Sequence, residues 1–354
     1  FRSVAAKLLT DFINDFPKDA RICEALTVRG DMYAKTKKEA EALMDFDRVI
    51  ARWPKAESAA AAWQRAAQIY AGRQDMANMA KYYEGLIQNF PKASPAALAE
   101  AHFLLGRAAF DQGDFKSSIS HMAEAKTLDP QKYGEQVNVL SVLSYHKLQD
   151  VNKLKEALET LQKENPSAVA RVPDVIPAWL GLQAYGMKDL ETADKYMTWA
   201  TQNDQLQNVK KVIWRNLAQA RLALKKYDRA LVASNNFLKD EDQPYRRADG
   251  MLDKASILLG LGKYADARKT AEDALALGVE GPLMASLKIV LGDISYAEKK
   301  FDEAAKAYQH AMHLGTKNAD VYYNLGQIYE KRGKIDEAIV SYKQAIERYP
   351  EFAD

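Results

Sequence analysis

Few side chains in this 354-residue sequence are placed to do chemistry. Cys23 is the only cysteine, so it cannot form a disulfide within the chain. A reactive thiol needs an activating cation beside it, and we expect Cys23 to be a spectator. The histidines number five: His102, His121, His146, His310 and His313.

His310 and His313 are the one pair with a suggestive spacing, because residues three apart can share one side of a helix. A metal site needs further ligands in a closed geometry, and no other candidate ligand lies at a matching distance in the sequence. We therefore expect no metal and no cofactor.

Motifs for catalysis are also lacking. The double glycine of Leu-Gly-Leu-Gly-Lys at 259–263 follows a helical pattern and lacks the spacing of a phosphate-binding loop, so it predicts a turn. We find no Ser/His/Asp arrangement, nucleophile elbow or paired-carboxylate motif. The sequence predicts a protein that is not an enzyme. An enzyme or a glycan-binding protein would need carboxylates clustered with exposed aromatic rings in a groove.

Composition does not single out a nucleic acid or a membrane as partner. The 50 basic and 48 acidic residues leave a net charge of +2, whereas nucleic-acid binding favours a strong basic excess. The locally basic stretch 210–247 is interpreted as solvated helix faces. No apolar run approaches the ~20 residues that a membrane helix needs, and no signal-peptide pattern is present.

A repeat supplies the organisation of the chain, and its best copy spans 319–352. Counted from Ala319, Gly326 falls at position 8, Ala338 at 20 and Tyr342 at 24. We expect positions 8 and 20 to face each other where two helices cross, because small side chains there let the backbones approach. Apolar residues follow a helical period throughout.

The same register extends back through almost the whole sequence. It predicts nine repeats that begin at residues 23, 60, 99, 135, 174, 211, 248, 285 and 319. Residues 1–22 match the second helix of a further repeat whose first helix is missing, and we expect the full protein to contain residues upstream of Phe1. The fold class is thus all-α: residues 1–354 are expected to form a single right-handed superhelical solenoid of about nineteen helices.

The pattern of 319–352, with Tyr322, Leu325, Gly326, Tyr329 and Pro350, resembles the tetratricopeptide repeat family. This resemblance implies helix–turn–helix units that bind other proteins. The style of 89–106, with Asn-Phe-Pro-Lys before a long first helix, is similar to repeats of bacterial cell-envelope proteins. It suggests the bacterial periplasm or outer-membrane association, with the cytoplasm as the alternative.

In this family the first helix of each unit lines the concave surface, chiefly through positions 2, 5, 9, 12 and 13. The carboxylate clamp of co-chaperone members is absent here, since positions 5 and 9 do not pair Lys with Asn. The middle units instead combine apolar and aromatic side chains with a few polar ones, which suits a peptide with apolar anchors. The candidate partner-binding residues are Phe103, Arg107, Phe110, Val139, Leu143, His146, Leu182, Tyr185, Arg215, Gln219 and Leu222.

Two functions follow from this pattern. The first is a non-enzymatic scaffold that holds a peptide or a segment of a partner protein in the concave, partly apolar groove. The alternative is a sensor or regulatory region of a larger protein with an additional N-terminal domain. An alternative role for the candidate side chains is packing against the neighbouring first helices.

Overall fold

The computed structural model describes residues 2–202 and 207–348, and within these ranges it contains nineteen α-helices, one 3₁₀ helix and no strand. This confirms the expected all-α repeat architecture. The chain divides into two compact units, residues 1–172 and 173–354, and each is described by itself.

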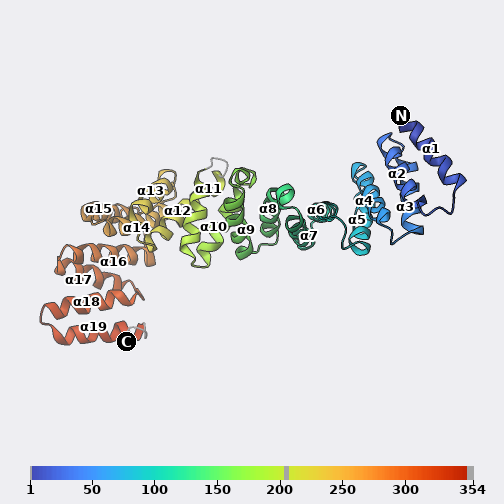
Figure 1. Ribbon diagram of the computed structural model, residues 1–354. Coiled ribbons are helices and arrows are strands. Elements are labelled where there is room, and N and C mark those ends of the chain that lie inside the picture. Colours follow the sequence, from blue (N-terminus) through green and yellow to red (C-terminus); the bar gives the residue numbers. More distant parts are fainter. Residues whose placement is uncertain (1, 203–206, 349–354) are drawn as a thin grey trace. The chain divides into compact units, whose positions relative to one another are not determined.

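Consecutive helices within each unit run antiparallel and pack side by side (Figure 1). Unit 1 contains α1 (Arg2–Asp15), α2 (Ile22–Lys35), α3 (Glu39–Arg52), α4 (Glu57–Gly72), α5 (Met76–Asn89), α6 (Pro95–Asp111), α7 (Phe115–Leu128), α8 (Pro130–Lys147), α9 (Val151–Glu164) and η1 (Pro166–Arg171). Unit 2 contains α10 (Val175–Gly186), α11 (Leu190–Thr201), α12 (Gln207–Ala223), α13 (Tyr227–Lys239), α14 (Pro244–Gly260), α15 (Tyr264–Leu275), α16 (Gly281–Ala297), α17 (Phe301–His313), α18 (Ala319–Lys331) and α19 (Ile335–Arg348).

The even-numbered helices are the first helices of the repeats and the odd-numbered ones the second. A turn at position 15 separates them, and this position has positive φ in all nine repeats. Glycine occupies it at Gly113, Gly262 and Gly333. The other six are Lys37, Gln74, Gln149, Lys188, Lys225 and Lys299. The left-handed residue reverses the chain, so that the second helix can fold back on the first.

An aspartate begins four of the second helices. The side chains of Asp75, Asp114, Asp150 and Asp189 each accept a hydrogen bond from the backbone N–H three residues further on. Such an N-cap satisfies one of the free N–H groups of the first helical turn. The left-handed turn and the N-cap together fix where these second helices start.

In several repeats the two helices meet at a glycine at position 8 of the first helix and a large side chain at position 24 of the second. A methyl group built on Gly292 would lie 2.5 Å from Cε1 of Tyr308, and one on Gly326 would lie 2.6 Å from Cε1 of Tyr342. The same ring-on-glycine contact joins Gly30 and Phe46. The close approach expected at position 8 is present. In these three repeats, however, the side chain nearest to the glycine is the ring at position 24 and not the small residue at position 20.

Successive repeats bury their apolar surfaces against each other. In unit 2, Tyr308 of α17 shares one buried cluster with Val321 and Leu325 of α18, which belongs to the next repeat. Tyr308 and Val321 are both fully buried. The second helix of one repeat is therefore covered by the first helix of the next.

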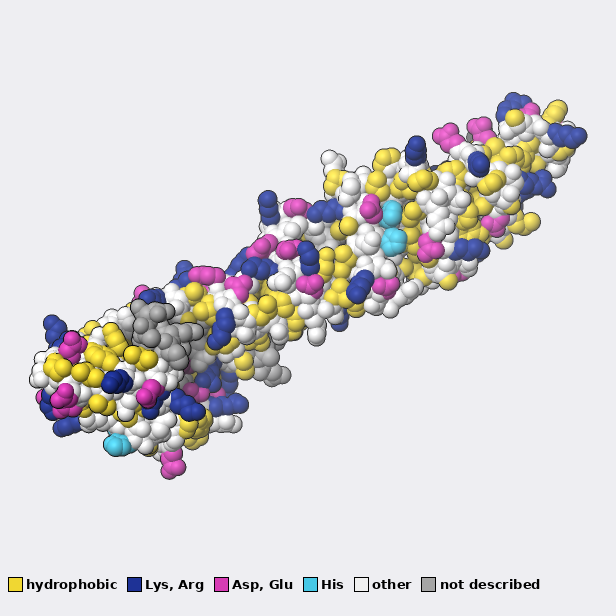
Figure 2. All heavy atoms as spheres, turned by 90° about the horizontal axis from the view of Figure 1, so that it is seen from below, with side chains coloured by type: hydrophobic (Ala, Val, Ile, Leu, Met, Phe, Trp, Pro, Cys, Tyr) yellow, Lys and Arg dark blue, Asp and Glu magenta, His cyan; other side chains and the backbone are white. Residues whose placement is uncertain are grey.

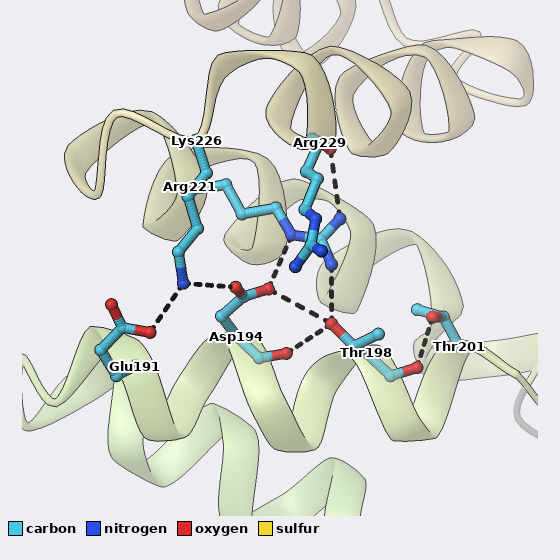
Figure 3. Close-up of polar contacts among 7 residues, drawn as sticks. All are labelled: Glu191, Asp194, Thr198, Thr201, Arg221, Lys226 and Arg229. Carbon is cyan, nitrogen blue, oxygen red and sulfur yellow. Dashed lines mark hydrogen bonds and ion pairs between the residues drawn. The ribbon is translucent and has the colours of Figure 1, made fainter.

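Ion pairs accompany this stacking. Figure 3 shows the buried carboxylate of Asp194 on α11, which accepts hydrogen bonds from Nε of Arg221 at 2.7 Å and from Nζ of Lys226 at 3.0 Å. Lys226 also donates to Glu191 at 2.6 Å. Asp194 and Arg221 are each 6% exposed, so removing Asp194 would leave the guanidinium group of Arg221 buried without this ion-pair partner.

None of the described helices combines the length and the hydropathy needed to cross a bilayer. On the face that Figure 2 shows, basic and acidic side chains are interspersed with apolar ones.

We predict that Gly292→Ala lowers the free energy of unfolding by about 1–3 kcal/mol, because the added methyl group overlaps the buried ring of Tyr308. Gly134→Ala is the matched control. Gly134 also lies inside a first helix, but a methyl group there meets no heavy atom within 4 Å outside the helix backbone. Removing this helical glycine is expected to stabilise by roughly 0.5–1 kcal/mol. Urea unfolding followed by circular dichroism measures both, and an equal effect of the two substitutions would contradict the ring-on-glycine contact.

Candidate functional site

The candidate residues all lie on first helices, as the register predicts. In unit 1 they fall on α6 and α8, and in unit 2 on α10 and α12. The members in unit 1 are Phe103, Arg107, Phe110, Val139, Leu143 and His146; those in unit 2 are Leu182, Tyr185, Arg215, Gln219 and Leu222.

Five of the six residues in unit 1 line one groove between α6 and α8, with a volume of about 370 Å³. The walls are apolar side chains that are each half-buried, so they present part of their surface to the groove. The lining residues are Phe103, Arg107, Phe110, Asp111, Gln136, Val139, Leu140, Leu143 and Arg171. His146 is the one candidate of unit 1 that does not line it.

Aromatic contacts hold the walls of this groove in place. The ring of Phe103 stacks on Tyr133 with centroids 4.6 Å apart, and the ring of Phe110 meets Phe115 edge-on at 5.4 Å. Tyr133 is itself buried. Because each wall ring is fixed by a second ring, the depression is largely pre-formed.

Charged side chains stand at the rim. Nε of exposed Arg107 lies 3.8 Å from Oδ2 of Asp111, and Nη1 of Arg171 lies 2.7 Å from Oε1 of Glu135. Ion pairs that are this exposed contribute little to stability. Their guanidinium groups can exchange these partners for a ligand at low cost.

The polar candidates of unit 2 are engaged in contacts between repeats. The hydroxyl of Tyr185 donates to Oε1 of Gln219 at 2.7 Å, and Nε2 of Gln219 donates to Oδ2 of Asp253 on α14 at 2.9 Å. Arg215 forms ion pairs with Asp249 and with Asp253. These side chains join α10, α12 and α14 across the first-helix face.

Unit 1 repeats this arrangement between α4 and α6. Nε2 of Gln64 donates to Glu100 at 2.7 Å, and Nε2 of Gln68 donates to the same carboxylate at 2.8 Å. In unit 1, the residues at positions 5 and 9 of one repeat contact position 2 of the next repeat. In unit 2, the residues at positions 5 and 9 contact positions 2 and 6 of the next repeat. A complementary pair at these positions therefore marks a contact between repeats.

The apolar candidates of unit 2 are half-buried. Leu182, Tyr185 and Leu222 pack against the buried cluster that includes Ala184, Leu217 and Ile257. His146, in unit 1, is half-buried as well, and burial lowers the pKa of its imidazole. The structure thus gathers Phe103, Arg107, Phe110, Val139 and Leu143 into one groove and places the other six candidates elsewhere.

Sequence reasoning missed four further residues that line the groove: Asp111, Gln136, Leu140 and Arg171. Gln136 and Leu140 are at positions 2 and 6 of their repeat. Leu140 could have been found from the sequence. An apolar residue at position 6 cannot form the polar contact with the preceding repeat that Asp253 forms at this position in unit 2.

Among the described residues, no group of three or more His, Cys, Asp or Glu side chains is arranged to hold a metal. Sequence reasoning overlooked one histidine pair: Nδ1 of His102 on α6 lies 3.0 Å from Nδ1 of His121 on α7. One imidazole must donate and the other accept, so the contact requires at least one neutral ring. Burial lowers the pKa of both rings, which favours this neutral state.

Two carboxyl groups on the first-helix face of unit 2, those of Asp253 and Asp293, are half-buried. Burial raises the pKa of Asp253 to about 6, against the opposing effects of Arg215 and Gln219. Burial likewise raises the pKa of Asp293 to about 6, although the Tyr308 hydroxyl donates a hydrogen bond to it at 2.7 Å. Because both lie within contacts between helices, their charge bears on stability.

Models of the tetratricopeptide repeat match residues 61–93, 96–133, 252–319 and 319–352. No curated protein matches the chain.

Several solved structures are similar to it. MamA from Desulfovibrio magneticus RS-1 (residues 41 to the end) is 16% identical with a TM-score of 0.41, and the match covers 50% of this chain and 96% of that one. TTC0263, a repeat protein of Thermus thermophilus, is 20% identical with a TM-score of 0.41 over 50% of this chain and 92% of that one. The Cut9–Hcn1 complex matches 99% of this chain and 78% of that one at 15% identity and a TM-score of 0.42.

We predict that Asp293→Asn stabilises the chain at pH 8 by about 1–3 kcal/mol, since it removes a partly desolvated charge and keeps an acceptor for the Tyr308 hydroxyl. The folded-state pKa of Asp293 lies above its unfolded value, so its carboxyl destabilises the fold increasingly as pH rises through about 6. The advantage of Asn must therefore shrink as pH falls from 8 to 5.

Urea unfolding at several pH values measures this difference, with Asp273→Asn as a control because Asp273 is exposed and is not among the groups that shift the pKa of Asp293. An advantage of Asp293→Asn that is the same at pH 8 and pH 5 would show that the charge of Asp293 is not its cause.

Proposed function

Because the chain belongs to the tetratricopeptide repeat family, we propose that it is a protein-interaction scaffold that holds a segment of a partner protein in the groove between α6 and α8. The groove carries this proposal, since it presents half-buried apolar walls beside exposed guanidinium groups. Such walls suit one or two apolar anchor side chains of a peptide, and the polar rim suits its backbone and polar groups.

The choice of unit 1 over unit 2 rests on what the first-helix side chains already contact. Arg215 and Gln219 are bonded to Asp249 and Asp253, and a ligand would have to break these contacts. Arg107 is exposed, and its nearest carboxylate is Asp111 on the same helix. The groove residues are thus available to a partner without the loss of a contact between repeats.

The proposed partner segment is a peptide with large apolar side chains, in an extended or a helical conformation. A volume of about 370 Å³ is in the range of small ligand pockets and holds a few side chains. Affinity would come mainly from these anchors, since exposed ion pairs at a rim add little.

A random-peptide display library tests the proposal. We predict that selection on the whole chain enriches peptides with recurring apolar anchors, and that Phe103→Ala or Leu143→Ala weakens their binding tenfold or more. Leu182→Ala is the matched control, because Leu182 is also a half-buried leucine of a first helix but lies outside the groove. It is expected to leave the affinity, measured by fluorescence anisotropy, unchanged.

Thermal unfolding of each variant shows that the fold is kept. Peptides that bind equally well to the wild type and to both groove variants would refute the groove as the site.

A further inference from the structure

Two arginines from different elements line the groove between α6 and α8. Arg107 belongs to α6, and Arg171 belongs to η1, the 3₁₀ helix that follows α9. The charged lining residues are these two guanidinium groups and the carboxylate of Asp111, a net charge of +1. A peptide in the groove therefore meets cations beside the walls that hold its apolar anchors.

The position of Arg171 is set by an element outside the repeat pattern. Among the described residues, η1 is the one helical segment between a second helix and the following first helix. It is firmly packed, because Ala168 is 1% exposed and Val172, which follows η1, is 5% exposed. Oδ1 of Asn165 at its start accepts a hydrogen bond from Nδ2 of Asn138 on α8 at 2.7 Å. A fixed backbone thus carries Arg171, whose own side chain is exposed.

Both guanidinium groups have partners that a ligand can displace. The ion pair of Arg107 with Asp111 spans 3.8 Å, which is longer than a hydrogen bond, and both side chains are exposed. Arg171 and Glu135 are exposed as well. Such pairs contribute at most about 1 kcal/mol. Arg215 in unit 2 differs, because it is half-buried between two carboxylates of the next repeat.

The chemistry of these groups favours a carboxylate. The planar guanidinium group donates hydrogen bonds in a geometry that matches a carboxylate. A bound peptide excludes water from the half-buried walls formed by Phe103, Val139 and Leu143, and the attraction between opposite charges is stronger where water is excluded. A purely apolar peptide would cover the guanidinium groups without offering an acceptor. A nucleic acid would need a longer row of cations than these two.

We infer that the partner segment carries an acidic side chain next to its apolar anchors, and that Arg107 and Arg171 bind this side chain. The inference rests on the proposed function, since the groove must first hold the segment. The apolar anchors supply most of the affinity, while the acidic side chain selects among apolar peptides and speeds their association. The repeat register does not reveal this site, because Arg171 lies after the last position of its repeat.

The peptides selected from the random library serve as probes. We expect those selected on the whole wild-type chain to share an Asp or Glu at a fixed distance in sequence from an apolar residue. One such peptide is synthesised with both termini blocked, so that it has no terminal carboxylate. We predict that Arg107→Glu or Arg171→Glu weakens its binding several-fold, and that both together weaken it tenfold or more.

Arg65→Glu is the matched control for these variants. Arg65 is also an exposed arginine of a first helix with a carboxylate partner, Asp31, but it does not line the groove. This substitution is expected to leave the affinity unchanged. Thermal unfolding verifies that each variant keeps its fold.

A charge exchange tests the contact itself. The same peptide with Lys in place of its acidic residue should bind the wild type tenfold or more weakly, and should regain affinity for the double variant of Arg107→Glu and Arg171→Glu. Raising the salt concentration from about 0.05 to 0.5 M should weaken binding of the acidic peptide to the wild type. The peptide with the corresponding amide should respond little to salt.

The outcomes separate this inference from the proposed function. Selected peptides that lack an acidic residue, or that bind the double variant as well as the wild type while Phe103→Ala weakens them, would overturn the inference and leave the groove as the site. Binding that disappears when the C-terminus is blocked would also overturn it, because a terminal carboxylate would then be the bound group. Peptides that ignore both Phe103→Ala and Leu143→Ala would refute the proposed function, and the inference with it.

Discussion

A two-helix repeat cannot bury both sides of its second helix alone, so that helix depends on the first helix of the next repeat. In unit 2 this dependence is visible where Tyr308 fills the space over Gly292 on one side and meets α18 on the other. The ring is fully buried only because both neighbours are present. The glycine at position 8, the ring at position 24 and the incoming first helix act as one packing unit.

The same dependence decides which surfaces remain available to partners. Stacking brings the first helices next to each other, and polar side chains on them bond across the repeats wherever the positions are complementary. Gln64 and Gln68 share Glu100 in unit 1, and Arg215 bonds to Asp249 in unit 2. Between α6 and α8 the facing residues are apolar, and the result is a groove. We propose that a partner binds where the contacts between repeats leave first-helix side chains exposed.

The sequence was sufficient for the fold because repeat packing imposes local constraints. Only a small residue at Gly326 admits the ring of Tyr342, and the expected repeat of residues 319–352 is matched by a family model. The turn between the helices was predicted less accurately than the helix packing. Gly260 and Gly262 both suggested a turn, but only Gly262 has positive φ, whereas Gly260 packs against the ring of Tyr227.

The site was less predictable, since a side chain's availability depends on a residue some 34 positions away. Arg107 and Arg215 look alike in the sequence, yet Arg107 is exposed while Arg215 is paired with Asp249 and Asp253 of the next repeat. The pair of His102 and His121 likewise joins two helices whose relative rotation no spacing rule specifies.

We propose that first-helix residues separate into those that hold repeats together and those that hold a partner. A substitution scan of all first-helix side chains, scored in parallel for folded abundance and for binding of a library-selected peptide, tests it most directly. We expect substitutions at Phe103 and Leu143 to reduce peptide binding more than they reduce the amount of folded protein. Substitutions at Arg215 and Gln219 are expected to reduce the amount of folded protein, while the protein that does fold binds the peptide as the wild type does. The reverse assignment, with binding lost at Arg215 and Gln219 and kept at Phe103 and Leu143, would contradict it.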